Sequence, residues 1–188
     1  VKDNGIEFFY QGPLKGGIVL ETNVHPGFLT DWQQPFVTLL TQAQGTSIVH
    51  ETVYENRFGY AETLLDMGAD IELLTECLGN CPCRFYAKNF KHSAIIKGAT
   101  PLEGKEIAVP DLRACFAYVM AALIAKGTSK LSNLHYLDRG YEDLDKKLLQ
   151  LGANIQRKSV AMLEFFLKIS YRGFTPSKML RLDKIPSL

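Results

Sequence analysis

The sequence contains no long hydrophobic run and almost no excess of charge of either sign. Its 188 residues include 21 Lys or Arg and 20 Asp or Glu, which gives a net charge of +1 at pH 7. No apolar run reaches the roughly 18 residues of a membrane-spanning helix. A balanced charge also gives no electrostatic reason to bind nucleic acid or an anionic membrane. We therefore expect a globular cytoplasmic protein with neither of them as a partner.

The amino terminus lacks an initiator methionine and the apolar segment of a signal peptide, and begins Val1-Lys2-Asp3-Asn4-Gly5. Such a start is typical of an internal position, so we expect a fragment of a longer protein. A glycine-rich phosphate loop of recognised spacing is also missing.

Cysteine is scarce, and three of the four cysteines lie close together. Cys77, Cys81 and Cys83 form the motif CLGNCPC, and Cys115 lies apart. A zinc site would need a fourth ligand such as His92, and the C-x3-C-x-C spacing does not match the common zinc fingers. We therefore expect reduced structural thiols, with no metal and no cofactor.

One internal repeat organises the chain. Gly45-Thr46-Ser47 recurs as Gly127-Thr128-Ser129, and Arg57 recurs as Arg139, both 82 positions later. A helical apolar run then leads to Met-Gly-Ala-Asp in one copy and to Leu-Gly-Ala-Asn in the other. A period this long indicates a duplicated supersecondary unit.

Each copy predicts strands and helices in the order β-α-β-α-β-β. In the first copy we expect strands at 16–22, 47–52, 69–74, 84–87 and 92–97, and helices at 30–44 and 57–67. In the second copy we expect an opening segment at 107–110, helices at 111–126 and 141–151, and strands at 129–134 and 153–157. The apolar helix faces need a sheet to cover, which predicts an α/β (α+β) fold. We expect one partial domain at 1–158, with units at about 17–105 and 106–158. Residues 159–188 are left as an unassigned tail, in which 160–171 fit either helix or strand.

The repeat places similar charged residues in both copies. An aspartate opens the first helix of each (Asp31, Asp111), and an arginine follows the next strand (Arg57, Arg139). If the copies pack as related units, these ends converge, and helix N-termini with arginines favour phosphate or carboxylate ligands. An aspartate there can accept a proton from a substrate hydroxyl. The pattern suits a metal-free reaction between an anionic substrate and a hydroxyl.

A simpler interpretation competes with this one. Spacing alone favours plain helix N-caps for the two aspartates. The two arginines also fit surface ion pairs with Glu55 and Asp138, which contribute little to stability.

Several motifs in order point to one family. The segments are HPGFLTDWQQPF, GTSIVHETVYENRF, MGADIE, VPDLRA, GTSKLSNLHYLDRGYE and LGANIQR. Over about residues 6–158 they resemble the UDP-N-acetylglucosamine 1-carboxyvinyltransferases, a branch of the enolpyruvyl transferase family. The sister branch, the 5-enolpyruvylshikimate-3-phosphate synthases, tends to show a Lys-Glu-x-x-Asp-Arg pattern instead.

The resemblance implies an inside-out α/β barrel (alpha/beta prism) with two domains of three β-α-β-α-β-β units each. This chain would hold two units of one domain, with the missing amino-terminal part of the enzyme as its partner. The implied reaction transfers the enolpyruvyl group of phosphoenolpyruvate to the 3-hydroxyl of UDP-N-acetylglucosamine, the first committed step of peptidoglycan synthesis. It implies no cofactor, and the chain alone is expected to be inactive. A non-catalytic binding fragment and the sister synthase remain as alternatives.

The resemblance also implies roles for particular residues. Asp31 matches the proposed base that contacts the sugar 3-hydroxyl, and Val53 matches a position touching the UDP-sugar. Arg139 matches an arginine that holds the phosphate or carboxylate of phosphoenolpyruvate. The remaining matches line the closed cleft: Arg57, Asp111 and Arg113.

The chain departs from the family at three places. Leu29 stands where the family usually has proline, the region 77–90 is longer than usual, and the residues after Lys158 have no counterpart. Cys115 does not match the family's mobile-loop cysteine, which would lie before Val1.

Overall fold

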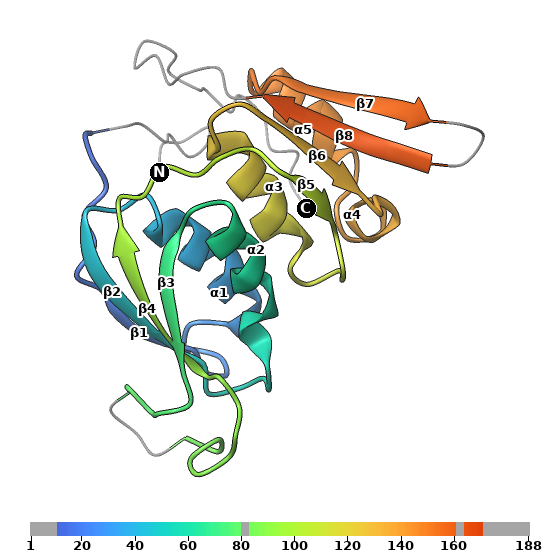
Figure 1. The fold of residues 1–188 in the computed structure, drawn as a ribbon. Helices are drawn as coiled ribbons and strands as arrows, with labels where there is room; N and C mark the ends of the chain where they lie inside the picture. Colours follow the sequence, from blue (N-terminus) through green and yellow to red (C-terminus); the bar gives the residue numbers. More distant parts are fainter. Residues whose placement is uncertain (1–10, 80–82, 161–163, 171–188) are drawn as a thin grey trace, which may run out of the picture.

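Two four-stranded sheets, with helices standing between them, make up the described part of the chain (Figure 1). The computed structural model describes residues 11–79, 83–160 and 164–170. Within these ranges, no helix is long and apolar enough to cross a membrane.

The first sheet has the strand order β1-β2-β4-β3. In chain order its unit contains β1 (Val19–Glu21), α1 (Thr30–Leu40), β2 (Gly45–His50), η1 (Arg57–Tyr60), α2 (Ala61–Asp66), β3 (Asp70–Leu74) and β4 (Ser93–Gly98). β1 pairs with β2 in parallel, and β4 pairs antiparallel with both β2 and β3. The predicted β-α-β-α-β-β order is therefore confirmed for this unit.

The second sheet repeats this topology, with the order β5-β6-β8-β7. Its unit contains β5 (Glu106–Ala108), α3 (Cys115–Ile124), β6 (Thr128–Ser132), α4 (His135–Gly140), α5 (Leu144–Gln150), β7 (Ile155–Val160) and β8 (Glu164–Ser170). In both sheets the last strand of the unit lies between the second and the third, with the same parallel and antiparallel pairings. This agreement supports the duplication that the repeat predicts.

The core lies where α1 and α3 pack against each other between the sheets (Figure 1). α3 also contacts β6 and β8, so it is covered on more than one side. Ala117, Ala121 and Ala122 are buried alongside the larger side chains of Cys115, Tyr118 and Val119, because small side chains let neighbouring elements approach closely. The helix is therefore buried on more faces than a simple amphipathic pattern predicts.

The buried face of α1 is polar near its first turn. Val37 and Leu40 are buried, but Trp32 is 57% exposed, and Gln33 and Gln34 are buried in its place. Buried polar side chains need hydrogen-bond partners. This end of the helix therefore packs against hydrogen-bonding groups rather than against a purely apolar surface.

Two predicted elements of secondary structure are wrong. Residues 84–87 form turns rather than a strand, closed by hydrogen bonds such as Lys88 N to the carbonyl of Phe85 at 2.9 Å. The helix expected at 141–151 begins only at Leu144, and α4 precedes it. The break falls where Asp143 adopts a positive φ of 49°, which a helix does not accommodate.

The second sheet extends past residue 158, where the unit was expected to end. β8 lies between β6 and β7 and pairs with both. Leu167 and Ile169 are fully buried while Lys168 is exposed, the alternation of a strand with one covered face. The second unit therefore runs to Ser170. The rest of the predicted tail lies outside the described residues.

Candidate functional site

A buried arginine connects the start of α1 to the turn that follows β2. The Arg57 side chain is only 4% exposed, and its Nη2 donates to Asp31 Oδ1 at 2.5 Å and to the carbonyl of Thr30 at 3.3 Å. With the amide oxygen of Gln34 turned toward the guanidinium, that oxygen accepts from Nη2 at 2.9 Å and from Nε at 2.5 Å. Arg57 thus donates hydrogen bonds to the buried polar groups in the first turn of α1. It also binds the Asp31 carboxylate on the side that faces the protein interior.

Asp31 does not cap α1, contrary to the simpler interpretation. Leu29 occupies the N-cap position and no side chain caps the helix. The carboxylate of Asp31 is bound by Arg57 instead, while its side chain is 73% exposed. Asp31 therefore presents a fixed and accessible carboxylate to solvent.

Asp111 does act as a local cap. Its Oδ1 accepts the backbone amides of Arg113 at 2.7 Å and Ala114 at 2.9 Å, in the turn just before α3. This is the role that spacing predicts for it. Asp31 and Asp111 thus occupy equivalent positions in the repeat, but Asp111 caps its helix whereas Asp31 pairs with Arg57.

A fully buried carboxylate holds the loop that follows β2. Oε1 of Glu51 accepts the amides of Val53 at 2.8 Å and Tyr54 at 2.9 Å, and Oε2 accepts the Thr30 hydroxyl at 2.9 Å. Glu51 therefore ties the loop that carries Val53 to the helix start that carries Asp31. Sequence reasoning missed it, because one acidic residue after a strand has no distinctive spacing.

Substituting Glu51 tests this role. We expect Glu51→Ala to lower the free energy of unfolding by about 3 kcal/mol, because three donors lose their acceptor. Glu51→Gln should keep most of the stability, because its amide oxygen can accept the two backbone amides and its NH2 can donate to the Thr30 hydroxyl oxygen. Urea unfolding of both variants measures the difference. An equal loss in the two variants would contradict the role.

Tyr54 brings the two units into contact. The guanidinium carbon of Arg57 lies 5.2 Å from the centre of its ring, and that of Arg113 lies 5.0 Å from it. Nη1 of Arg113 also donates to the Tyr54 hydroxyl oxygen at 3.3 Å. Each guanidinium–ring contact is favourable, and together the two contacts place positive charge from both units at one position.

A cleft of about 670 Å³ opens at this contact between the units. Its lining residues are Gln34, Tyr54, Asn56, Arg57, Gly59, Tyr60, Pro110, Asp111, Leu112, Arg113, Ala114 and Tyr118. The volume lies in the range of small-molecule sites. The structure thus brings three predicted residues, Arg57, Asp111 and Arg113, to one cleft, and Asp31 joins them through Arg57. Half-buried Val53 precedes Tyr54 in the loop.

Two tyrosines of the cleft are neutral at physiological pH. Burial raises the pKa of Tyr118 to about 12, and burial raises the pKa of Tyr60 well above its ordinary value. The Tyr60 hydroxyl donates to Gln33 Oε1 at 3.1 Å. The cleft wall therefore contributes hydroxyl groups rather than phenolates.

Arg139 is not among the residues that line this cleft. It lies in the last turn of α4 and is exposed. Two residues on, burial raises the pKa of the Tyr141 hydroxyl.

The alternative ion pairs suggested for the arginines are wrong. Glu55 pairs with Arg84 at 3.4 Å rather than with Arg57. Both oxygens of Asp138 bind Arg157, at 2.8 Å and 2.5 Å, rather than Arg139. The positions of the two arginines are thus not explained by those surface pairs.

Cys115 is chemically inert in this fold. It is fully buried, and its Sγ donates to the carbonyl of Leu112 at 2.9 Å. Burial raises the pKa of its thiol to about 11, with the charge of Asp111 adding to the rise. The thiol stays protonated at neutral pH and is unsuited to nucleophilic attack.

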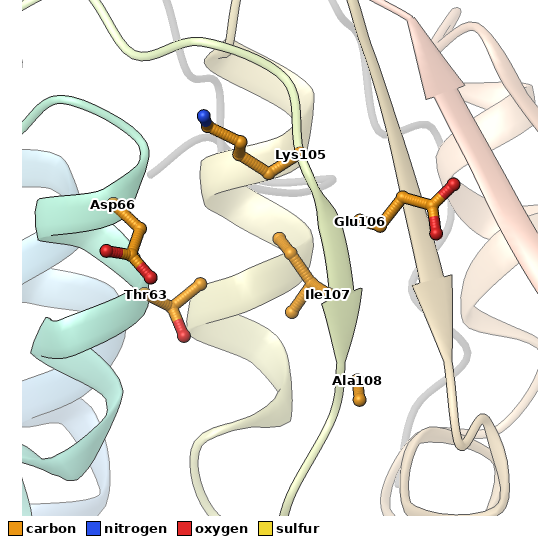
Figure 2. Close-up of a pocket in the computed structure, with 6 residues that line it drawn as sticks. All are labelled: Thr63, Asp66, Lys105, Glu106, Ile107 and Ala108. Carbon is orange, nitrogen blue, oxygen red and sulfur yellow. The ribbon is translucent and has the colours of Figure 1, made fainter.

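A smaller cavity of about 280 Å³ lies between α2 and β5. Figure 2 shows Thr63 and Asp66 on α2 facing the chain that enters β5, while Glu106 points away from α2 toward β6. There Glu106 pairs with Lys130 at 3.8 Å. We assign no ligand to this cavity.

The family model described as EPSP synthase (3-phosphoshikimate 1-carboxyvinyltransferase) matches residues 5–148, well over half of the chain. The chain belongs to the EPSP synthase family. Relatives in this family include the UDP-N-acetylglucosamine 1-carboxyvinyltransferase of Protochlamydia amoebophila, 68% identical over 82% of this chain and 33% of the relative. The enzyme of the same name from Chlamydia abortus is 57% identical over 88% of this chain and 37% of the relative. The chain thus spans about a third of the length of these curated relatives.

Solved structures of the EPSP synthase family share the fold. The enolpyruvyl transferase NikO from Streptomyces tendae superposes with a TM-score of 0.65 at 27% identity, covering 80% of this chain and 31% of NikO. An EPSP synthase from Acinetobacter baumannii gives a TM-score of 0.51 at 14% identity, covering 86% of this chain and 32% of that one, a likeness of fold alone. The predicted fold class is therefore confirmed.

Proposed function

We propose that this chain is part of an enzyme that transfers the enolpyruvyl group of phosphoenolpyruvate to the 3-hydroxyl of UDP-N-acetylglucosamine. The observation that carries the proposal is the exposed Asp31 carboxylate, held by buried Arg57 beside a cleft that also contains Arg113. The name and the 68% identity of the relative from Protochlamydia amoebophila support this choice of substrates.

The proposed reaction uses Asp31 as the general base. Its carboxylate accepts the proton of the sugar 3-hydroxyl, and the oxygen forms a bond to C2 of phosphoenolpyruvate while C3 gains a proton. The resulting tetrahedral ketal then loses phosphate from C2 and a proton from C3, which restores the double bond. Arg57 keeps the carboxylate in place during the first step.

The arginines supply the positive charge that the anionic substrates need. Arg113, beside Tyr54, offers a planar guanidinium at the cleft. Exposed Arg139 at the end of α4 is proposed to hold the phosphate or carboxylate of phosphoenolpyruvate, and Val53 to contact the UDP-sugar. The two sheets are proposed to belong to one partial domain, and the remaining parts of the enzyme to close the cleft. In this proposal the enzyme works in the cytoplasm and serves peptidoglycan synthesis.

Assaying the chain with and without the rest of the enzyme tests the proposal. The complete enzyme should release phosphate from phosphoenolpyruvate only when UDP-N-acetylglucosamine is added, and the 188-residue chain alone should give no turnover. Shikimate 3-phosphate as the acceptor is the matched control. Turnover with that acceptor would reassign the substrate to the sister branch, and no turnover with either acceptor would favour a binding role.

A further inference from the structure

Four sulfur and nitrogen atoms converge at the end of β2 and the start of β4. His50, Cys77, Cys83 and His92 each place one ligand-type atom within 4.8 Å of the other three. Cys77 Sγ lies 3.0 Å from Cys83 Sγ and 3.1 Å from Nε2 of His92. Three of these side chains are buried and Cys77 is half-buried.

The hydrogen bonds of Ser93 determine which nitrogen of His50 carries the proton. Ser93 Oγ donates its single proton to the carbonyl of Glu76 at 2.5 Å. Nδ1 of His50, 2.8 Å from the same oxygen, must therefore be the donor, which leaves the lone pair on Nε2. Nε2 is buried and has no hydrogen-bond partner within the described ranges. A buried acceptor without a partner is costly, so this atom needs a ligand.

His92 has the same arrangement. Its Nδ1 lies 2.7 Å from the carbonyl oxygen of Phe90, which can only accept, so Nδ1 donates and Nε2 carries the lone pair. A histidine that gives Nδ1–H to an oxygen and turns Nε2 inward has the orientation of a metal ligand with its supporting hydrogen bond. Both histidines of the cluster therefore present an unprotonated Nε2 to the two sulfur atoms.

The backbone brings the four residues together from distant parts of the chain. His50 ends β2 and His92 directly precedes β4, and these strands pair with His50 opposite Ser93. The two cysteines lie on the connection between β3 and β4, residues 75–92, which returns to this end of the sheet. Strand pairing, rather than local spacing, therefore assembles the cluster.

The connection lies so close to His50 that it needs glycine at position 79. A Cβ on Gly79 would lie 2.6 Å from Cδ2 of His50 and 2.6 Å from Oε1 of Glu21, closer than real side chains approach. On the other side, the fully buried ring of Phe85 lies 5.8 Å from the ring of His92. The cluster is thus enclosed by backbone and by an aromatic side chain.

We propose that His50, Cys77, Cys83 and His92 bind a structural zinc ion. Two thiolates and two imidazoles are a closed tetrahedral donor set for zinc. Zn–S bonds of about 2.3 Å and Zn–N bonds of about 2.0 Å place neighbouring ligand atoms roughly 3.3–3.8 Å apart. The Cys77–Cys83 and Cys77–His92 separations are within about 1 Å of that geometry, and the other ligand atoms lie within 4.8 Å of one another. Each thiol releases a proton as it binds, and no ligand position is left for a substrate.

The zinc site revises the expectation of plain structural thiols. His92 was the fourth ligand considered from sequence, but His50 lies far earlier in the chain, where no spacing rule connects it to the cysteines. The ion would pin the 75–92 connection to β2 next to Glu51, the buried carboxylate that holds the Val53 loop. The zinc ion would therefore stabilise the loop beside the cleft without taking part in the reaction.

Metal analysis of the unmodified 188-residue chain tests the proposal without any substitution. The chain should be purified from zinc-supplemented culture without a chelator. Elemental mass spectrometry should then find one zinc ion per molecule. Cobalt substituted for zinc should show the thiolate charge-transfer and tetrahedral d–d absorption bands. Removing zinc with a chelator should lower the Tm by on the order of 10 °C, and zinc added back should restore it.

Matched variants identify the ligands. His50→Ala and Cys77→Ser should each reduce bound zinc roughly ten-fold or more. His135→Ala, at an exposed histidine, and Cys115→Ala, at a cysteine outside the cluster, should keep one zinc per chain. A zinc-free native chain, a Cys77–Cys83 disulfide in zinc-containing buffer, or full zinc content in both ligand variants would each overturn the proposal.

Discussion

Replacing Asp31 by asparagine in the complete enzyme is expected to lower kcat by about 10³-fold, because positioned general bases contribute roughly 10² to 10⁴. Asparagine keeps the size of the side chain and a carbonyl oxygen for Arg57, but it cannot accept a proton at neutral pH. The KM values should change much less than kcat, since the loss falls on the step in which the hydroxyl attacks. Phosphate release under saturating substrates measures the effect.

The control for this prediction is Asp66→Asn, at an exposed aspartate on α2 outside the cleft. Its kcat should equal that of the unmodified enzyme. Asp66→Asn should unfold at the same urea concentration as the parent. Asp31→Asn should lower the free energy of unfolding by no more than about 1 kcal/mol, because the Asp31 side chain is largely exposed and asparagine keeps an oxygen for Arg57. Phosphate release by Asp31→Asn within about five-fold of the parent would remove Asp31 from the role of base.

The repeat in the sequence predicts the fold well because the local spacing of apolar residues determines where strands and helices form. Strands and helix faces follow from spacing, so the first unit appears with the expected order of elements. In the second unit α4 is an additional helix and β8 lies beyond the expected end. β8 was ambiguous because a short apolar run around Leu167 fits either a helix or a strand. Pairing with β6 and β7 makes this segment a strand, and that pairing cannot be predicted from the local sequence pattern.

The candidate site was only partly predictable for the same reason. Arg57 and Asp31 could be named from the repeat and the motifs, but their direct contact depends on how the loop after β2 folds back onto α1. Glu51 and Tyr54 carry no signal of their own, because their role is set by amides and arginines from other elements. His50 joins the cysteines only through the register of β2 and β4.

Removing the guanidinium of Arg57 should damage both stability and catalysis. We expect Arg57→Ala to lower the free energy of unfolding by about 3 kcal/mol, because Arg57 is buried and its loss leaves the buried amide oxygen of Gln34 without a donor. The Asp31 carboxylate also loses the group that fixes its position, so kcat should fall by about 10²-fold or more. Urea unfolding and phosphate release measure the two effects separately.

Two further variants show whether the geometry of the Arg57 guanidinium or only its charge is responsible for these effects on stability and kcat. Arg57→Lys keeps the charge, but a single ammonium cannot reproduce the planar fork that reaches Asp31 and Gln34 together, so its losses should be intermediate. Arg84→Ala removes an arginine whose ion pair with Glu55 is exposed, and should change stability by no more than about 0.5 kcal/mol. If Arg57→Ala and Arg84→Ala had equal effects on unfolding, Arg57 would be an ordinary surface charge. The fixed carboxylate of Asp31, on which the proposed proton transfer depends, would then lose its structural basis.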